Sequence, residues 1–353
     1  MTNTFLAANT ANGFFSLFDE MTKRTDHKIF LIKGGPGTGK SSLMKKAARA
    51  ASDKGMAVEQ IHCSSDPDSL DGVWIKDIKL ILLDATPPHS VDPRYPGVVE
   101  HILPLGEYWN RDKLKAHRKE IVDLSGRISG TFEHIYRLLQ GAGQMQKMSQ
   151  SIVEAAFQKE KAVASLIKFF RRQAILPLQK TGRSERRFIS ALSCKGDILY
   201  EDIFQDCAQA LMIEENYECS HLILNLADRI LSEMGYDRIR LLSSLQPDHI
   251  EHLVVPECSL AIVTKNNRLC PQSELPVVKK LSLKGFLDND IISAGKNKLA
   301  FGKKMCKTLY DEVSALLASE KALHDELEQF YIEAMNFDAL NDMTDKFILE
   351  NIG

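Results

Sequence analysis

The feature that most constrains this chain is an internal repeat with an offset of 180 residues. Residues 54–84 align without a gap with residues 234–264, and the alignment pairs Gly55 with Gly235 and preserves the apolar pattern. Shorter matches lie on both sides of this block. A fixed internal offset of this kind predicts two copies of one structural unit. The length of 353 residues also exceeds what one hydrophobic core usually fills.

The apolar pattern within each copy predicts the α/β class. HKIFLIK is typical of a buried strand, SSLMKKAARAASD of a helix, and AVEQIHC and IKLILLD of two further strands. Strands that alternate with helices predict a parallel sheet with right-handed crossovers, and ligands are then expected at the carboxyl ends of the strands. We therefore predict two duplicated parallel-sheet α/β domains, at residues 1–182 and 183–353.

Each copy ends in a long amphipathic segment. From Leu114 onward, apolar residues follow three-and-four spacing, and the second copy ends in the same way. We predict helical hairpin extensions over about residues 111–178 and 295–350. The helices are expected to pack on their own sheet, and the alternative is a coiled coil that binds a protein partner.

Residues 31–42 read LIKGGPGTGKSS and contain the nucleotide-binding pattern G-x-x-x-x-G-K-[ST] between a predicted strand and a predicted helix. Glycines permit positive φ angles and a close approach of backbone amides to a phosphate, and the helix start adds the positive end of its dipole. The residues predicted to bind the polyphosphate are Gly34, Gly35, Pro36, Gly37, Thr38, Gly39, Lys40, Ser41 and Ser42.

The same region predicts the ligands of a magnesium ion. Lys40 is expected to reach the β- and γ-phosphates of ATP, and Ser41 to offer its hydroxyl to Mg²⁺. IKLILLD ends in Asp84, a Walker B pattern, so Asp84 is the second predicted metal contact. Ala85 follows where many strong ATPases carry a catalytic Glu, which predicts slow turnover.

The second copy serves as an internal control because it has lost this pattern. EENYECSH replaces GGPGTGKS, Ser220 replaces Lys40, and Thr264 replaces Asp84. Its three glutamates would repel a polyphosphate. We therefore predict one nucleotide site in the first copy and an empty pseudo-site in the second.

Residues that were lost together with the loop are candidates for function. Asp66 becomes Gln246, and His89 has no His or acid opposite it, so both are predicted catalytic residues. Each has a structural alternative: Asp66 followed by Pro67 is also a helix start, and a lone His is also a common packing residue. By the same comparison Pro67 and Asp68 are kept in the second copy as Pro247 and Asp248 and are assigned to the turn. Asp71 is kept as the acid Glu251.

With this loop, the stretch DATPPH from Asp84 to His89 and the duplication, the chain resembles an uncharacterised bacterial family of P-loop ATPase-like proteins built as tandem repeats. The resemblance covers nearly the whole length and implies the P-loop fold and ATP binding. Relatives keep a P-loop in each half, and this chain departs from that pattern in its second half. The loop also looks like that of AAA-type ATPases, but the acid pair of their second region is missing.

Composition excludes several other classes of protein. Lys plus Arg number 45 against 47 for Asp plus Glu, so no global field favours nucleic acid or an anionic membrane. The chain has no run of about 18 apolar residues and no signal sequence at its start, so a cytoplasmic location is expected. The seven cysteines include no C-x-x-C pair, which favours reduced thiols over disulfides or a metal cage.

Three functions remain open at this point. The leading one is a slow or regulated ATPase with one active site. The first alternative is a kinase that passes the γ-phosphate to a small molecule, with Asp66 as the base. The second is a nucleotide-gated nucleic-acid binder, for which a solvated linker is the competing explanation. The nucleic-acid alternative is suggested by a run of basic residues: Lys168, Arg171, Arg172, Lys180, Arg183, Arg186 and Arg187.

Overall fold

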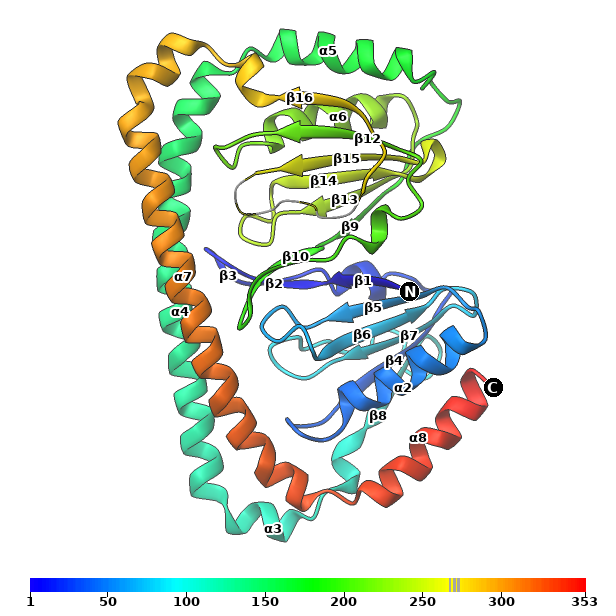
Figure 1. Cartoon of the computed structure of the whole chain (residues 1–353). Coiled ribbons are helices and arrows are strands. Elements are labelled where there is room, and N and C mark those ends of the chain that lie inside the picture. The colour runs from blue at the N-terminus through cyan, green and yellow to red at the C-terminus, as the bar shows by residue number, and fades with distance from the viewer. Residues whose placement is uncertain (267, 269–270, 272–273) are drawn as a thin grey trace.

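The structure is a computed structural model that describes residues 1–266, 268, 271 and 274–353. It contains two six-stranded sheets of the same design (Figure 1). The strand order is β1-β5-β6-β7-β4-β8 in the first sheet and β9-β13-β14-β15-β12-β16 in the second. Strand for strand, the two orders match along the chain, so two similar α/β sheet domains follow from the repeat.

The strands have the following bounds. The first sheet contains β1 (Thr2–Phe5), β4 (Lys28–Lys33), β5 (Val58–His62), β6 (Leu70–Ile75), β7 (Leu80–Asp84) and β8 (Glu100–Pro104). The second contains β9 (Ser184–Arg187), β12 (Gln209–Glu214), β13 (Arg238–Leu242), β14 (Ile250–Val255), β15 (Leu260–Lys265) and β16 (Val277–Ser282). Each copy adds a hairpin, namely β2 (Ala7–Thr10) with β3 (Gly13–Ser16) and β10 (Ser190–Ser193) with β11 (Gly196–Leu199).

The helices also occur in matching places. Those of the first copy are α1 (Asp19–Thr22), α2 (Lys40–Asp53), η1 (Leu105–Tyr108), α3 (Arg111–Ala116), α4 (Arg118–Ala156) and α5 (Lys159–Arg172). Those of the second are η2 (Asp202–Phe204), α6 (His221–Glu233), η3 (Pro256–Cys258), η4 (Leu283–Phe286), α7 (Asn289–Ala334) and α8 (Phe337–Asn351).

The sheets are mixed, which corrects the prediction of parallel sheets. In the first, β6 runs antiparallel to both β5 and β7, while the other pairings are parallel. A turn reverses the chain before β6: the Asp66 carboxylate accepts the Asp68 amide at 3.2 Å, and the Ser69 amide donates to the Asp66 carbonyl. No helix begins here, so the predicted helix cap at Asp66 is wrong. The reversal brings the first residues of β6 to the carboxyl ends of its neighbours.

The long helices do not form the hairpin that was predicted within each copy. α4 and α7 lie side by side and antiparallel, one from each copy (Figure 1). The prediction that they pack on their own sheet is also wrong for the short helices, because α5 contacts α6 of the second copy and α8 contacts α2 of the first. The short helices α5 and α8 therefore each cover the other copy.

The crossing is reciprocal in its backbone contacts. The Asn110 amide donates to the Ala334 carbonyl at 2.7 Å, and the Asn336 amide donates to Tyr108 at 2.8 Å. At the other end, the Asp288 amide donates to the Ala156 carbonyl and the Gln158 amide donates to the Phe286 carbonyl, each at 2.8 Å. Each long helix thus begins beside its own sheet and ends against the other one.

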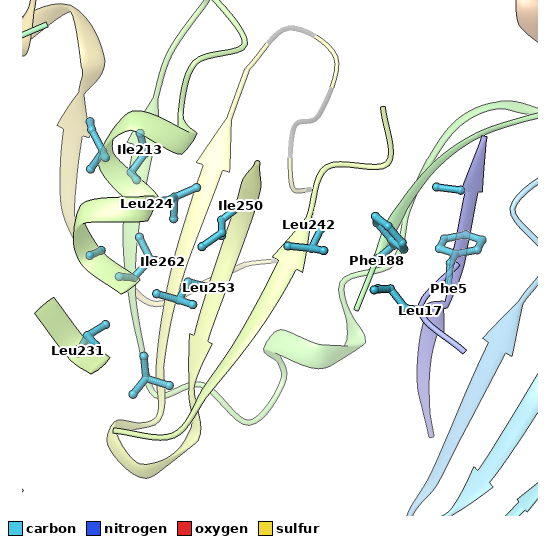
Figure 2. Close-up of a cluster of buried hydrophobic side chains, with 14 of the residues drawn as sticks. Phe5, Leu17, Phe188, Ile213, Leu224, Leu231, Leu242, Ile250, Leu253 and Ile262 are labelled. Atoms are coloured by element: carbon cyan, nitrogen blue, oxygen red, sulfur yellow. The ribbon is translucent and has the colours of Figure 1, made fainter. Parts of the chain in front are cut away.

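The two sheets also share a core. Phe5 at the end of β1 and Phe188 after β9 exchange backbone hydrogen bonds at 2.8 and 3.0 Å. Figure 2 shows that the buried cluster continues from these two rings through Leu242 to Leu224 on α6. Apolar burial therefore joins the copies across the sheet edges as well as through the helices.

A buried ion pair crosses the same joint. Arg187 Nε lies 2.6 Å from Glu59 Oε1, and the two side chains are 2% and 4% exposed. Burial by itself raises the pKa of the Glu59 carboxyl, but Arg187 and Lys76 outweigh it and lower this pKa to about 2. Thr4 adds a hydroxyl donor at 3.0 Å. The pair therefore ties β9 of one copy to β5 of the other.

Replacing Arg187 with Leu is expected to lower the free energy of unfolding by roughly 3 kcal/mol, because a buried carboxylate loses its main partner. Since the Glu59 pKa lies below the free value of 4.5, this loss should be full above about pH 4.5 and fade as the pH falls toward 2. Urea unfolding across that range measures it. Arg183→Leu, whose side chain is 89% exposed, is the control. Equal stability of the two variants at pH 7 would contradict the assignment.

Candidate functional site

The predicted nucleotide loop, residues 34–41, links β4 to α2 and has the backbone form its glycines permit. Gly37 and Gly39 have φ angles of 67° and 84°, in the left-handed region that disfavours side chains. Gly39 caps α2 without any side-chain hydrogen bond. The amides of the first turn and the positive end of the helix dipole are therefore available at this loop.

The structure brings Lys40 and Asp84, two of the predicted site residues, together. Lys40 Nζ donates to the carbonyl oxygens of Gly34 and Gly35 at 2.9 and 2.8 Å, and it lies 3.5 Å from Asp84 Oδ2. The cause is the pairing of β4 with β7, which sets Ile32 opposite Asp84. Both side chains are mostly buried, so the ammonium and the carboxylate form a fixed pair at the strand ends.

The remaining predicted metal ligand, Ser41, lies in the first turn of α2. Its hydroxyl oxygen accepts the Leu70 amide at 3.0 Å, which places it at the start of β6. Asp84 is oriented from the other side, since its Oδ1 accepts the Thr86 amide at 2.9 Å. A hydroxyl and a carboxylate oxygen are donors that suit magnesium. Ser42 is exposed, and Thr38 closes the loop through its hydroxyl bond to the Gly35 carbonyl.

Asp71 is a site residue that sequence reasoning did not select. It is 5% exposed and is the second residue of β6. The antiparallel register there sets Gly72 opposite Leu83 and so brings Asp71 beside Asp84. Burial raises its pKa to about 6; the charges of His89 and Lys40 act against the rise, and that of Asp84 adds to it. The signal in the sequence was an acid kept in both copies, which we assigned to folding.

His89, a predicted catalytic residue, lies beside Asp71. Its Nε2 lies 3.3 Å from Asp71 Oδ2, and its ring stacks on Phe18 with centroids 4.9 Å apart and meets Phe14 edge-on. Within the described part of the chain, Asp71 Oδ2 and His89 Nδ1 have no hydrogen-bond partner. A buried carboxylate oxygen without a bond is costly, which marks this pair as a candidate for chemistry.

Asp66 is not brought to the same place. Its Oδ1 belongs to the turn before β6, and its Oδ2 lies 3.6 Å from Lys321 Nζ on α7. His62 is held by Pro67 and Asn3 at 2.7 and 2.9 Å, as expected of a packing histidine. The contacts of both residues are structural.

The equivalent loop of the second copy is filled by its own side chain. Glu215 Oε2 accepts the amides of Tyr217 and Cys219 at 2.6 and 3.2 Å. The nearby cavity, which Glu218 and Glu251 help to line, measures about 30 Å³, room for roughly two water molecules. A nucleotide-sized pocket needs about 300 Å³ or more.

The acid–cation pair of the first copy has a counterpart in the second. Arg268 lies 3.3 Å from Glu251 Oε1 and 2.8 Å from Asp197, and Ser190 donates to Glu251 at 2.6 Å. Glu251 holds the place of Asp71 in the repeat, so the second copy keeps the acid and changes its partners.

Both loops are covered by a long helix from the other copy. Over the first loop, the Gly37 amide donates to Glu328 Oε1 of α7 at 3.2 Å. Over the second, Gln146 of α4 donates to Glu218, and Gln150 donates to Gln246 at 2.6 Å. These contacts could not be foreseen, because no sequence pattern indicated that the helices cross.

The basic run does not form one surface. Lys180 pairs with Glu257 and Asp237, Arg186 with Glu20, and Arg187 with Glu59. Arg171 and Arg172 lie exposed at the end of α5. With Arg183, which lies 3.5 Å from Asp237, four of the seven residues are used in internal ion pairs, which weakens the basis of the nucleic-acid alternative.

Comparison with known proteins found no matching family model, curated protein or solved structure. Among the helices of the described residues, none is both long and apolar enough to cross a membrane. The geometry of the loop and of the Asp71 pair is thus the evidence on which a function has to rest.

Asp71→Asn is expected to raise the stability of the protein at pH 7 by about 2 kcal/mol and to leave it unchanged at pH 4. The folded pKa of about 6 lies above the free value of 3.8, so the wild type loses stability as the pH rises through this interval. Denaturant unfolding of both proteins at the two pH values tests this. An effect of equal size at both would show that Asp71 is not perturbed.

Proposed function

We propose that the 34–41 loop binds the triphosphate of ATP together with Mg²⁺ and that the first copy hydrolyses it slowly. The observation that carries the proposal is the contact between Lys40 and Asp84, at 3.5 Å, beside a loop with two left-handed glycines and an uncapped helix start. Fixed amides, a lysine and an acid at adjacent strand ends are what a bound triphosphate and its metal require.

The residues divide the binding between them. Loop amides and the α2 dipole hold the phosphate oxygens. Lys40 leaves the carbonyl oxygens of Gly34 and Gly35, which satisfy its ammonium in this structure, and pairs with the β- and γ-phosphates. Ser41 and Asp84 would hold Mg²⁺, which supplies charge neutralisation of the phosphates.

Hydrolysis needs a group that accepts a proton from the attacking water. Within the described residues, the buried Asp71 Oδ2 accepts no hydrogen bond and has the His89 ring 3.3 Å away. Asp71 also neighbours Asp84 along the sheet, so we assign this role to it. Water adds to the γ-phosphorus, the bond to the β-phosphate oxygen breaks, and the products are ADP and inorganic phosphate. His89, packed between Phe14 and Phe18, positions the acid. Because no Glu follows Asp84, turnover is expected to be slow.

The second copy is proposed to be a pseudo-site. Glu215 takes two loop amides with its own carboxylate, and Ser220 stands where the binding lysine would be. One ATP per chain is the expected stoichiometry.

The kinase alternative depends on Asp66 as a base, and its carboxylate is engaged by the β5–β6 turn and by Lys321. An assay separates the two functions: an ATPase releases phosphate without an acceptor, whereas a kinase needs one. The geometry favours hydrolysis, because Asp71 and not Asp66 lies beside the Lys40–Asp84 pair.

Lys40→Ala is expected to weaken ATP binding by roughly 10- to 100-fold, since the ammonium makes charge-assisted contacts with the phosphates. Equilibrium dialysis with magnesium measures it. Lys45→Ala is the matched control, because Lys45 lies on the same helix and bonds to the Asp68 carbonyl. Equal retention of ATP by Lys40→Ala and wild type would overturn the proposal.

Asp71→Asn is expected to keep ATP binding and to lower kcat by roughly 100-fold or more, the usual effect of losing a general base. Phosphate release at saturating ATP gives kcat, and the dialysis assay gives binding. Wild-type turnover in this variant would remove Asp71 from the mechanism while leaving nucleotide binding intact.

A further inference from the structure

A carboxylate already occupies the phosphate loop. The Gly37 amide donates to Glu328 Oε1 at 3.2 Å, and Glu328 belongs to α7 of the second copy. A carboxylate oxygen is an anionic acceptor, as a phosphate oxygen is. Placing both beside the same N–H would bring like charges into contact in a partly buried site, which Coulomb repulsion opposes. The acid and a triphosphate therefore compete for this amide.

The end of α7 and the start of α8 lie directly on the loop glycines. A Cβ added to Gly35 would lie 2.8 Å from Tyr331 Cε1, one on Gly37 2.8 Å from the Glu328 carbonyl oxygen, and one on Gly39 2.9 Å from Leu340 Cδ2. Because these glycines have no side chain, the helices can approach the loop closely in this structure. The contact involves the helix backbone as well as the acid.

The second copy provides an internal comparison. The long helices of the two copies are offset by 178 positions, since their matching backbone bonds involve Ala156 in one and Ala334 in the other. By this offset Gln150 of α4 holds the place of Glu328, and it donates to Gln246 instead of entering the loop. The loop there receives its anion from Glu215, which lies two and four positions before the amides it binds. Only in the first copy does the described structure show the long helix supplying the anion to the loop.

Glu328 has room and charge partners outside the loop. Its side chain is 33% exposed, and His324 Nδ1 lies 3.6 Å from its Oε1. Lys321, one turn before His324 on α7, pairs with Asp325 and lies 3.6 Å from Asp66. These groups can receive the carboxylate when it leaves the Gly37 amide, without burying an unpaired charge.

We propose that Glu328 is an autoinhibitory stand-in for a phosphate oxygen, and that ATP displaces it and so releases the α7–α8 corner from the first copy. The inference rests on the proposed nucleotide binding at the same loop. α7 is a continuous helix of 46 residues, about 70 Å long, whose other end follows β16 and η4 of the second copy. Nucleotide binding in one copy is thereby coupled to a helix anchored in the other.

The first test compares ATP affinity, measured calorimetrically with magnesium, in wild type, Glu328→Gln and Glu328→Ala. Both variants should bind ATP about fivefold more tightly, because they remove a charged competitor that is partly screened by solvent. Glu326→Gln, an exposed acid on the same helix, should match wild type. Unchanged or weaker binding in both Glu328 variants would sink the inference, and with wild-type binding intact it would leave the proposed function standing. No binding by any of the four proteins would defeat both.

The second test follows hydrogen exchange of residues 325–351 in the full chain with and without Mg·ATP. Exchange in this segment should become faster on ATP binding in wild type and stay unchanged in Lys40→Ala. Protection of the segment by ATP would show that the helix closes over the nucleotide, which is the opposite of displacement, while ATP binding itself would remain established.

Discussion

The reciprocal crossing of α4 and α7 is the constraint on which the rest of this structure depends. Each helix starts at the last strand of its own sheet and ends on the loop of the other, and paired backbone bonds fix both crossing points. Ile152 sits so close to Gly295 that an added Cβ would lie 2.6 Å from it. A boundary at residue 182 therefore separates the repeats in sequence but does not separate two independently packed bodies, since each copy supplies the cover of the other.

The repeat also shows which buried charges belong to the fold and which belong to one copy. An acid at the start of the antiparallel strand occurs in both, as Asp71 and Glu251. In the second copy it is satisfied by Arg268 and by the Ser190 hydroxyl. In the first, its partner is His89, and one carboxylate oxygen has no hydrogen bond within the described residues. Burying an incompletely bonded acid costs stability, and such a cost persists more readily where the group acts in chemistry.

The sequence was enough to predict the loop and Asp84, but not the position of Asp71 or the exchange of helices between the copies. The loop pattern and the apolar strand ending in Asp84 were enough to select Lys40 and Asp84 as site residues, because the second metal contact is expected at the end of a strand that neighbours the loop. The strand that brings Asp71 to the site was missed, since Asp66 and Pro67 suit a turn as well as a helix start. The exchange of helices was missed for a different reason: an amphipathic stripe indicates that a face is buried, not which element buries it.

The two loops finally differ in how they satisfy the same physical need. A concave row of amides at a helix start attracts an anion, and a chain that folds such a loop without a ligand gains by supplying one. In the second copy the anion, Glu215, is part of the loop and accepts two of its amides. In the first copy the anion is carried on a separate helix and reaches the loop through one hydrogen bond. Loss of the lysine and gain of a built-in carboxylate would then close one site permanently, while the other stays open to exchange with a phosphate.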